Sequence, residues 1–459
     1  MNLASWLPKR SHNSASDAHR IGPTIRRTVL VLAILTAARC ALYSDVSIEP
    51  LTVIPTDIER GADLRDMVRH SDYLRAVEYA PVIDGSQKKD AADLVALAEA
   101  ELAANRTDAA RRHFRAVLDL TNQRNLGGQA AWGLSQVEYL ENNYETSLDW
   151  ANAAMDRGLI VMQWHLDFLK ALAHTQTYRH GHGPMSADVR MKFGRPDVPR
   201  LDVRVNDAPS TTTAIIDSGA VISIMSRRLA TQLALKRLDT APGTFYGLLG
   251  EPINVDFALL DSLEIGSMTL ENVPVAIMPD EKMRFLITGR KQFNIDFLLG
   301  ANLLKEFRLD FDFDRDRITF THLTPLEKRP AADQNLFFEG FRPTVRGTIN
   351  KHGWFQFVLD TGSEVTFLNE SRIASTPVNM FAPRIHSATL QGLGGAKKHG
   401  SKVEDVDIGV DRWTGRFKTL PMYSGPENER SVGIVGENFL KNFRAVVDFG
   451  RMRVDLERR

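Results

Sequence analysis

Two short motifs in this sequence have the residue types and the setting for chemistry. Each is an aspartate that follows three apolar residues and precedes a hydroxyl residue and a glycine: Asp217-Ser218-Gly219 and Asp360-Thr361-Gly362. The apolar residues predict a buried strand, and the glycine allows the tight turn that ends it. A carboxylate walled by apolar residues is costly unless it has a partner. The equivalent aspartate of the other motif is the partner that this repetition suggests.

Two carboxylates held within about 3 Å cannot both ionise, so we expect Asp217 and Asp360 to share one proton. The ionised carboxylate would act as general base on a water that attacks a peptide carbonyl. The protonated one would hydrogen-bond the carbonyl oxygen as charge develops there. Because the two groups titrate as a pair, neither role is assigned to one residue. This chemistry needs no metal ion and no organic cofactor.

These motifs belong to a longer internal duplication in the second half of the chain. From about residue 196 onward the sequence has short alternating strands with glycine turns. Six landmarks recur in the same order: 214–220 and 357–363, 246–250 and 391–395, 263–266 and 406–409, 273–275 and 420–422, 297–304 and 433–440, and 307–312 and 443–448. The duplication predicts two β lobes of one fold, each contributing one aspartate.

On these motifs, about residues 196–457 resemble retropepsin-like (retroviral-type) aspartic proteases, joined as a tandem pair of lobes. The resemblance implies a catalytic aspartate in each lobe, Asp217 and Asp360. It also implies that the catalytic loops are supported by Ser218, Gly219, Thr361 and Gly362. The hydroxyls of Ser218 and Thr361 would brace the two loops against each other. The landmarks 298–300 and 434–436 are similar to the strand that packs beneath each loop.

The resemblance also implies two glycine-rich flaps that close over an extended polypeptide substrate. A flap needs a flexible tip, and its main chain can pair with the substrate strand. The residues are Tyr246, Gly247 and Gly250 in lobe 1, and Gly392, Gly394 and Gly395 in lobe 2. Lobe 1 departs from the family pattern at Val221, where a polar or small residue is usual, whereas Glu364 in lobe 2 fits.

The region between Asp90 and about Tyr178 is predicted to be helical, since it is rich in Ala, Leu, Glu and Arg and contains no proline. Two stretches within it repeat one pattern of small and large residues, with Ala110 and Ser147 placed 37 residues apart. The pattern resembles tetratricopeptide-type helix pairs; an unspecialised helical bundle is the alternative. In either case we expect a scaffold, with a surface that is able to receive a protein partner.

The first 44 residues predict an export signal. Arg26 and Arg27 precede about ten apolar residues, too few for a comfortable membrane span, and small residues follow. Cleavage after Ala38 or Cys40 would give an exported, periplasmic or secreted protein. An uncleaved signal anchor that attaches the protein to a membrane, a lipoprotein at Cys40, and a helix of a folded cytosolic protein are the alternatives.

Composition sets further limits on function. The 459 residues allow about three domains at roughly 150 residues each. Residues 1–40 carry a net charge of +5 and the remainder −5, so the body of the chain lacks the basic excess of a nucleic-acid binder. The single cysteine, Cys40, excludes internal disulfides and thiolate zinc clusters.

Two other clusters of polar residues are interpreted as structural, and we predict no metal site. His174, His180 and His182 lie near a Gly-Pro linker and lack carboxylates at helical spacing. The acidic run 310–316 lacks the glycine and glutamate of a calcium loop, and it predicts a hairpin with solvated charges.

The sequence therefore predicts a multidomain α plus all-β protein, in which a helical domain precedes two retropepsin-like barrels that form a pseudo-dimer. The ranges are 1–44 for the signal, 45–185 for the helical domain, 196–325 for lobe 1 and 340–459 for lobe 2. The expected function is aspartic endopeptidase activity on polypeptides. The alternative is a non-catalytic module whose helices bind a partner and whose barrels bind a peptide without cutting it.

Overall fold

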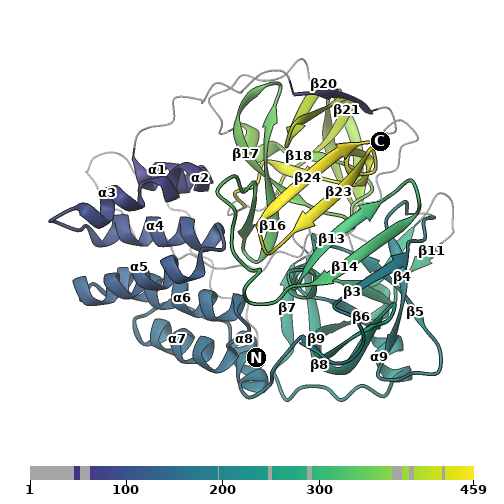
Figure 1. Cartoon of the computed structure of the whole chain (residues 1–459), viewed down its shortest axis with the longest axis horizontal. Coiled ribbons are helices and arrows are strands. Elements are labelled where there is room, and N and C mark those ends of the chain that lie inside the picture. The colour runs from purple at the N-terminus through teal and green to yellow at the C-terminus, as the bar shows by residue number, and fades with distance from the viewer. Residues whose placement is uncertain are drawn as a thin grey trace, which may run out of the picture.

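The computed structural model describes residues 46–51, 63–194, 196–246, 251–286, 292–374, 385–391, 397–425 and 429–459. Within these ranges the chain forms a stack of helices beside two β-barrels (Figure 1). The predicted fold class, a helical domain followed by two all-β lobes, is confirmed.

Short turns join the helices of the N-terminal domain into pairs. The helices are α1 (Leu64–Arg69), α2 (Tyr73–Glu78), α3 (Ala80–Gly85), α4 (Ala91–Ala103), α5 (Thr107–Leu120), α6 (Arg124–Leu140), α7 (Tyr144–Asp156) and α8 (Gln163–Leu172). Asn105 and Asn142 stand in the turns of the α4–α5 and α6–α7 pairs with φ of 54° and 63°, a left-handed conformation in which Asn is enriched. Ala110 and Ser147 are fully buried at the same place in each pair. The assignment of these pairs to the tetratricopeptide type stays a prediction.

Lobe 1 is a closed barrel of six strands in the order β9-β6-β12-β5-β4-β8, with β8 pairing back to β9. The strands are β4 (Arg200–Val205), β5 (Thr212–Ile216), β6 (Ile224–Ser226), β8 (Pro252–Ile265), β9 (Met268–Met278) and β12 (Phe297–Leu299). Strand β7 (Gly243–Tyr246) extends the sheet from β8, and β2 (Arg179–His180) extends it from β9. The remaining elements are α9 (Arg227–Gln232), η1 (Asp280–Lys282), β10 (Arg284–Leu286), β11 (Gln292–Asn294) and α10 (Ala301–Leu304).

Lobe 2 repeats this barrel strand for strand, in the order β21-β18-β22-β17-β16-β20, with β20 pairing back to β21. The strands are β16 (Arg342–Ile349), β17 (His352–Leu359), β18 (Phe367–Asn369), β20 (Lys397–Val410), β21 (Trp413–Tyr423) and β22 (Gly433–Val435). Around them lie β15 (Leu336–Glu339), α11 (Glu370–Ala374), β19 (Ile385–Gln391) and α12 (Glu437–Leu440). Each strand has the same partners as its counterpart in lobe 1, so the predicted duplication is confirmed.

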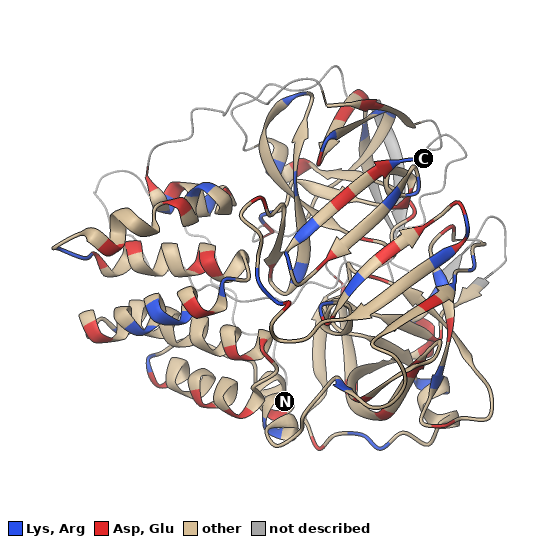
Figure 2. Ribbon diagram, viewed as in Figure 1, with Lys and Arg blue, Asp and Glu red and all other residues tan. Residues whose placement is uncertain are grey.

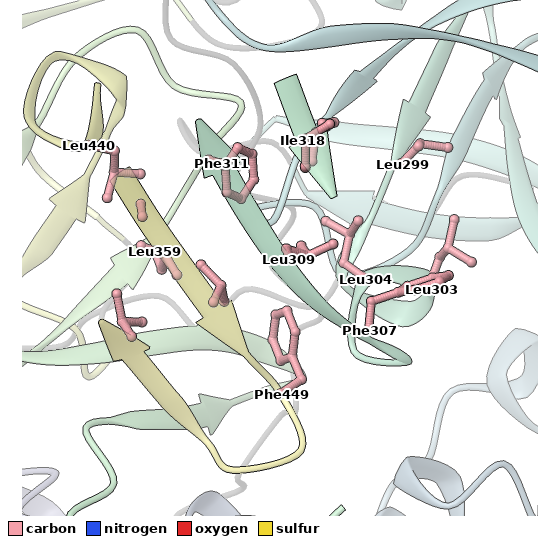
Figure 3. Close-up of a cluster of buried hydrophobic side chains, with 14 of the residues drawn as sticks. Leu299, Leu303, Leu304, Phe307, Leu309, Phe311, Ile318, Leu359, Leu440 and Phe449 are labelled. Atoms are coloured by element: carbon pink, nitrogen blue, oxygen red, sulfur yellow. The ribbon is translucent and has the colours of Figure 1, made fainter. Parts of the chain in front are cut away.

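A five-stranded sheet in the order β24-β23-β13-β14-β3 joins the two lobes. Its strands are β3 (Ser186–Arg190), β13 (Phe307–Asp312), β14 (Arg317–His322), β23 (Phe443–Asp448) and β24 (Arg453–Arg458). Strands β13 and β23 are counterparts in the repeat, and they pair antiparallel with Asp310 opposite the equivalent Val446. A strand pair centred on equivalent residues implies a local two-fold axis, so the lobes form a pseudo-dimer. Buried side chains from both lobes continue one core beneath this sheet (Figure 3).

The structure differs from the expected range 45–185 at both ends of the helical domain. Strand β1 (Val46–Pro50) pairs with β21 of lobe 2, and residues 179–180 pair with lobe 1. The helices themselves lie between Leu64 and Leu172. When the partner of a strand lies hundreds of residues away, neither composition nor local sequence pattern predicts that the two strands pair. The predicted signal, residues 1–44, lies outside the described residues.

Acidic and basic residues are interspersed along the helices and both barrels in the ribbon of Figure 2, as expected for a chain of balanced charge. In the described ranges, no helix is long and apolar enough to cross a membrane. The same ranges contain no cluster of three or more His, Cys, Asp or Glu residues placed to hold a metal ion. The acidic run 310–316 ends β13 and turns into β14, which is the predicted hairpin.

Candidate active site

Asp217 stands directly after β5, which runs parallel to β12 in the barrel of lobe 1. Its backbone N–H donates to the carbonyl oxygen of Leu299 at 3.0 Å, so the end of β12 fixes the start of the loop. The backbone N–H of Ala220 donates to Asp217 Oδ1 at 3.0 Å. The side chain of Asp217 is fully buried, as the apolar run before it predicts.

Asp360 has the same setting in lobe 2. It follows β17, which runs parallel to β22, and its backbone N–H donates to the carbonyl oxygen of Val435 at 3.0 Å. The backbone N–H of Gly362 donates to Asp360 Oδ1 at 2.9 Å, and Asp360 is 1% exposed. The two aspartates are therefore presented by equivalent loops of equivalent strands.

The glycines after the aspartates show how closely the two loops approach. A Cβ atom placed on Gly219 would lie 2.4 Å from Cγ of Asp360, and one placed on Gly362 would lie 2.5 Å from Cγ of Asp217. Each glycine therefore packs against the aspartate of the other lobe. The structure brings Asp217 and Asp360 together within one chain, across the pseudo-two-fold axis.

The hydroxyl residues of the motifs connect the same loops. The backbone N–H of Ser218 donates to Thr361 Oγ1, and the backbone N–H of Thr361 donates to Ser218 Oγ, both at 3.1 Å. The two side chains are buried. These bonds tie the two loops directly to each other.

Burial and mutual repulsion govern the charge of the pair. Burial raises the pKa of Asp217, and the neighbouring charge of Asp360 raises it further. Burial also raises the pKa of Asp360, although the N–H of Gly362 and the charge of Arg342 act against this. Asp217 Oδ2 is buried and accepts no hydrogen bond from an N–H or O–H group of the described residues. Two neighbouring buried carboxyls repel each other when both are ionised, so the ionised form of Asp217 is disfavoured.

A second pair of side chains supports the loops from below and was not predicted as part of the site. Asn302 Oδ1 accepts from the backbone N–H and the hydroxyl of Ser223 at 2.7 and 3.0 Å. Asn438 Oδ1 accepts the two equivalent bonds from Thr366, both at 2.8 Å. A sequence signal for these two asparagines was present. In both copies of the apolar-apolar-glycine landmark, the second residue after the glycine is Asn. A Cβ on Gly300 would lie 2.4 Å from the backbone of Ile222, so the landmark does pack beneath the loop.

The flap residues lie mainly outside the described residues. Tyr246 is the last residue of β7, which forms a hairpin with β8. The paired residues run from Gly243 opposite Val255 to Tyr246 opposite Pro252. In lobe 2, β19 and β20 form the equivalent hairpin, which ends at the pair Gln391–Lys397. The glycines Gly247, Gly250, Gly392, Gly394 and Gly395 fall between the described strands, so their role in a flap stays a prediction.

The residues that follow the two catalytic loops differ in polarity. Val221 is 3% exposed and packs among apolar side chains of lobe 1 and the helical domain. Its counterpart Glu364 accepts a hydrogen bond from the backbone N–H of Asp197, and burial raises the pKa of its carboxyl. The dyad is symmetric, whereas its immediate surroundings are not.

Comparison with known proteins agrees with this geometry. Residues 201–303, which form most of lobe 1, match the family described as aspartyl protease. A retropepsin-like aspartic protease from Rickettsia conorii is similar to this chain at 18% identity, covering 32% of this chain and 96% of that one, with a TM-score of 0.22. No curated protein matches the chain. The family match to lobe 1 and the repetition of its barrel in lobe 2 support a hydrolase of the aspartic protease type.

Proposed function

We propose that this protein is an aspartic endopeptidase that cleaves extended polypeptides with a water activated by Asp217 and Asp360. The observation that supports this most directly is the contact between each motif glycine and the aspartate of the other lobe. This contact places the two buried carboxyls next to each other. The ionised carboxyl can then accept a proton from water. The protonated one then donates to the carbonyl oxygen of the scissile bond.

The dyad is complete within one chain, so we infer that a monomer is active. The helices, the shared sheet and both loops that carry the pair belong to the same molecule. Because burial raises the pKa of both carboxyls, the pair keeps its shared proton to higher pH than an exposed carboxyl does. Cleavage is expected to decline as the pH rises far enough to remove that proton.

Replacement of either aspartate by asparagine tests the dyad. We expect Asp217→Asn and Asp360→Asn each to abolish cleavage of an unfolded protein at mildly acidic pH, with circular dichroism spectra unchanged. Asp119→Asn, at an exposed position on α5, is the matched control and should cleave like the wild type. Activity that survives in both single variants would contradict the proposal.

A statine-type peptide, which resembles the tetrahedral intermediate, gives an independent test because it needs an intact dyad to bind tightly. We expect it to inhibit the wild type. If the wild type cleaves no polypeptide at any pH and binds no such inhibitor, the barrels are a non-catalytic peptide-binding module, which is the competing function.

We further propose that the protein is exported. Support comes from the sequence alone, namely the basic pair Arg26-Arg27 and the short apolar run that follows. N-terminal sequencing of the protein from fractionated cells tests this. A mature start near residues 39–45 outside the cytosol is expected, a membrane-bound chain with an intact start indicates a signal anchor, and an intact Met1 in the cytosol would refute export.

A further inference from the structure

Asp360 lies across from a basic residue of the neighbouring strand. Strands β16 and β17 pair antiparallel, with Thr344 opposite Val358. The same register two residues farther along places Arg342, the first residue of β16, opposite Asp360. Residues that are directly opposite in an antiparallel pair lie on the same face of the sheet, with their Cβ atoms about 5 Å apart. The side chain of Arg342 therefore starts beside that of Asp360.

The equivalent position in lobe 1 is apolar. Strands β4 and β5 pair with Arg200 opposite Ile215, so the same two steps place Val198 opposite Asp217. The backbone N–H of the residue before Asp217 donates to the carbonyl oxygen of the residue after Val198 at 3.0 Å, so the pairing continues up to the catalytic loop. Val198 is fully buried in a cluster of apolar side chains. The two aspartates are alike, but one faces a valine and the other an arginine.

Arg342 is a buried cation with one anionic partner. It is 5% exposed, and its Nη2 donates to Glu429 Oε1 at 3.1 Å. Its Nη1 is also buried and has no hydrogen-bond acceptor among the described residues. Glu429 is held in turn through Oε2, which accepts from the hydroxyl of Tyr423 at 2.8 Å and from the amide of Asn369 at 3.3 Å. The guanidinium therefore has a fixed place, where solvent screens its charge little.

The charge of Arg342 acts on the nearer aspartate. Burial raises the pKa of Asp360 to about 7, and the N–H of Gly362, the hydrogen bond with Asp217 and the charge of Arg342 act against a larger rise. Burial and the neighbouring charge of Asp360 raise the pKa of Asp217 well above its ordinary value. Asp360 is thus the carboxyl that ionises more easily, and it is the one with a cation opposite.

Other titratable side chains face these two residues from the elements packed around them. With Asp217 of lobe 1, they are Glu339 of β15, Tyr423 of β21, Glu429, and Glu437 of α12. Burial raises the pKa of Glu437 and that of Tyr423, so both are neutral at mildly acidic pH. Glu339 accepts hydrogen bonds from two buried hydroxyl groups at 2.7 and 2.8 Å. In this set of side chains, Arg342 supplies the positive charge.

We propose that Arg342 breaks the symmetry of the dyad: its charge makes Asp360 the ionised carboxyl, which serves as general base, and leaves the shared proton on Asp217. As the water oxygen bonds to the peptide carbon, Asp360 accepts a proton from the water and Asp217 donates its proton to the carbonyl oxygen. Arg342 acts through Asp360 and is therefore a positioning residue. The proposal rests on the proposed protease function, and it assigns the two roles that the duplicated sequence leaves equivalent.

The first test is the pH dependence of kcat/KM for a peptide substrate. Its acid limb reports the ionisation of the general base, so removal of the cation should move this limb to higher pH. We expect a shift of about one pH unit or more in Arg342→Met/Glu429→Gln, which replaces the ion pair by two neutral side chains. Arg342→Lys keeps a positive charge and should have a limb close to that of the wild type.

A matched control removes an ion pair at the surface of the same lobe. Arg416 Nε lies 3.0 Å from Asp407 Oδ1, and Arg416→Met/Asp407→Asn should leave both limbs of the profile in place. If Arg342→Met/Glu429→Gln lowers the rate equally at every pH without moving the acid limb, Arg342 only supports the fold and the proposal is wrong.

The second test measures folding and does not depend on cleavage. In Asp360→Asn the remaining carboxyl, Asp217, keeps its proton in the folded protein, while the unfolded chain releases it above about pH 4. The free energy of unfolding should therefore fall more steeply between pH 4 and pH 7 than in Asp217→Asn, where Asp360 ionises opposite Arg342. Addition of Arg342→Met/Glu429→Gln to Asp217→Asn should make its slope nearly as steep as that of Asp360→Asn. Urea unfolding measures each slope.

The two tests separate failure of this assignment from failure of the protease function. If the wild type cleaves no polypeptide but the slopes differ as expected, the charge asymmetry is supported and the protease function fails. Equal slopes in Asp217→Asn and Asp360→Asn, or a steeper slope in Asp217→Asn, would overturn the assignment even in an active enzyme. If the triple variant does not fold, the comparison of these two single variants decides.

Discussion

Ser218 and Thr361 each bond the strand end that carries the other lobe's aspartate. Ser218 Oγ donates to the carbonyl oxygen of Leu359 at 2.6 Å, and Thr361 Oγ1 donates to that of Ile216 at 2.8 Å. These carbonyls belong to the residues immediately before Asp360 and Asp217. Each hydroxyl also accepts the backbone N–H of the other residue, so the brace acts on the backbone on both sides of the dyad.

Removal of one hydroxyl from this brace should cost both stability and activity. In Thr361→Val the N–H of Ser218 and the carbonyl of Ile216 lose their partner in a buried site, at about 1–3 kcal/mol for each group left unpaired. Cleavage should fall by roughly a hundredfold, since small displacements of a catalytic group are costly. Urea unfolding and kcat measurements check both effects. Thr361→Ser keeps the hydroxyl and should retain most of the activity; equal losses in the two variants would contradict the role of the hydroxyl.

Addition of a single methyl group to a motif glycine should separate the aspartates. In Gly219→Ala the new Cβ would lie 2.4–2.7 Å from the carboxyl atoms of Asp360, so the carboxyl has to move. We expect activity to fall by about a hundredfold or more, with a smaller effect on unfolding. Gly85→Ala is the matched control, because nothing lies within 4 Å of its Cβ position, and its stability should change by less than about 0.5 kcal/mol. Full activity in Gly219→Ala would show that the loops are farther apart than this structure has them.

The dyad and the barrels were predictable because the sequence carries two copies of the same motif series. Local pattern alone marks Asp217 as an aspartate after a strand, and only its recurrence at Asp360 supplies a partner. Asn302 and Asn438 lay within the recognised landmarks, yet their role requires knowledge of which backbone groups the loops leave unpaired. That information is present in the folded chain and absent from residue spacing.

Contacts between the helical domain and the lobes were not predictable from local pattern. Trp164 has the spacing of an ordinary core residue of α8, and nothing near it in the sequence indicates that its ring faces β7. Strand β1 likewise has its partner, β21, more than 360 residues away. The same absence of tertiary information made Val221 look like a departure from a catalytic pattern, whereas the structure places it among apolar side chains of lobe 1 and the helical domain.

Glu306 is a buried carboxylate at the joint between lobe 1 and the helical domain, and its charge should be essential to stability. Lys305 Nζ lies 2.5 Å from Glu306 Oε1 and also donates to the carbonyl oxygen of Leu140 on α6 at 2.9 Å. Burial raises the pKa of Glu306, but Lys305 and Lys328 outweigh it and hold that pKa below its usual range. The stabilisation is therefore present above the ordinary carboxyl pKa of 4.5 and is lost as the pH falls through the lower folded value.

Glu306→Gln should destabilise the protein by about 3–5 kcal/mol at pH 7, because Lys305 is left buried with no anionic partner. Urea unfolding at pH 7 measures this, and the difference from the wild type should shrink in strong acid. Glu281→Gln, an exposed position on η1, is the control and should unfold like the wild type. A Glu306→Gln variant as stable as the wild type would show that the ion pair does not hold the two domains together.

Glu437 presents the opposite case, a buried carboxyl that should reduce stability at neutral pH. It is 1% exposed, and neither of its carboxyl oxygens has a hydrogen-bond partner in the described part of the chain. Burial raises its pKa well above 4.5, and the charges of Asp197 and Asp360 add to this. As the pH rises above about 4.5, the unfolded chain releases this proton while the folded protein keeps it, so the free energy of unfolding falls.

Glu437→Gln has no such proton, so its stability should exceed that of the wild type by an amount that grows with pH. The growth should be about 1.4 kcal/mol per pH unit between the ordinary pKa and the raised folded one, and the two proteins should converge near pH 4. Thermal unfolding from pH 4 to 7 checks this, with the exposed Glu457→Gln as control. A difference independent of pH would mean that the folded protein ionises Glu437 and provides it with a partner. Because the folded protein keeps Glu437 protonated and neutral at mildly acidic pH, its replacement by the neutral Gln should leave the shared proton of the dyad, and therefore cleavage, largely unchanged.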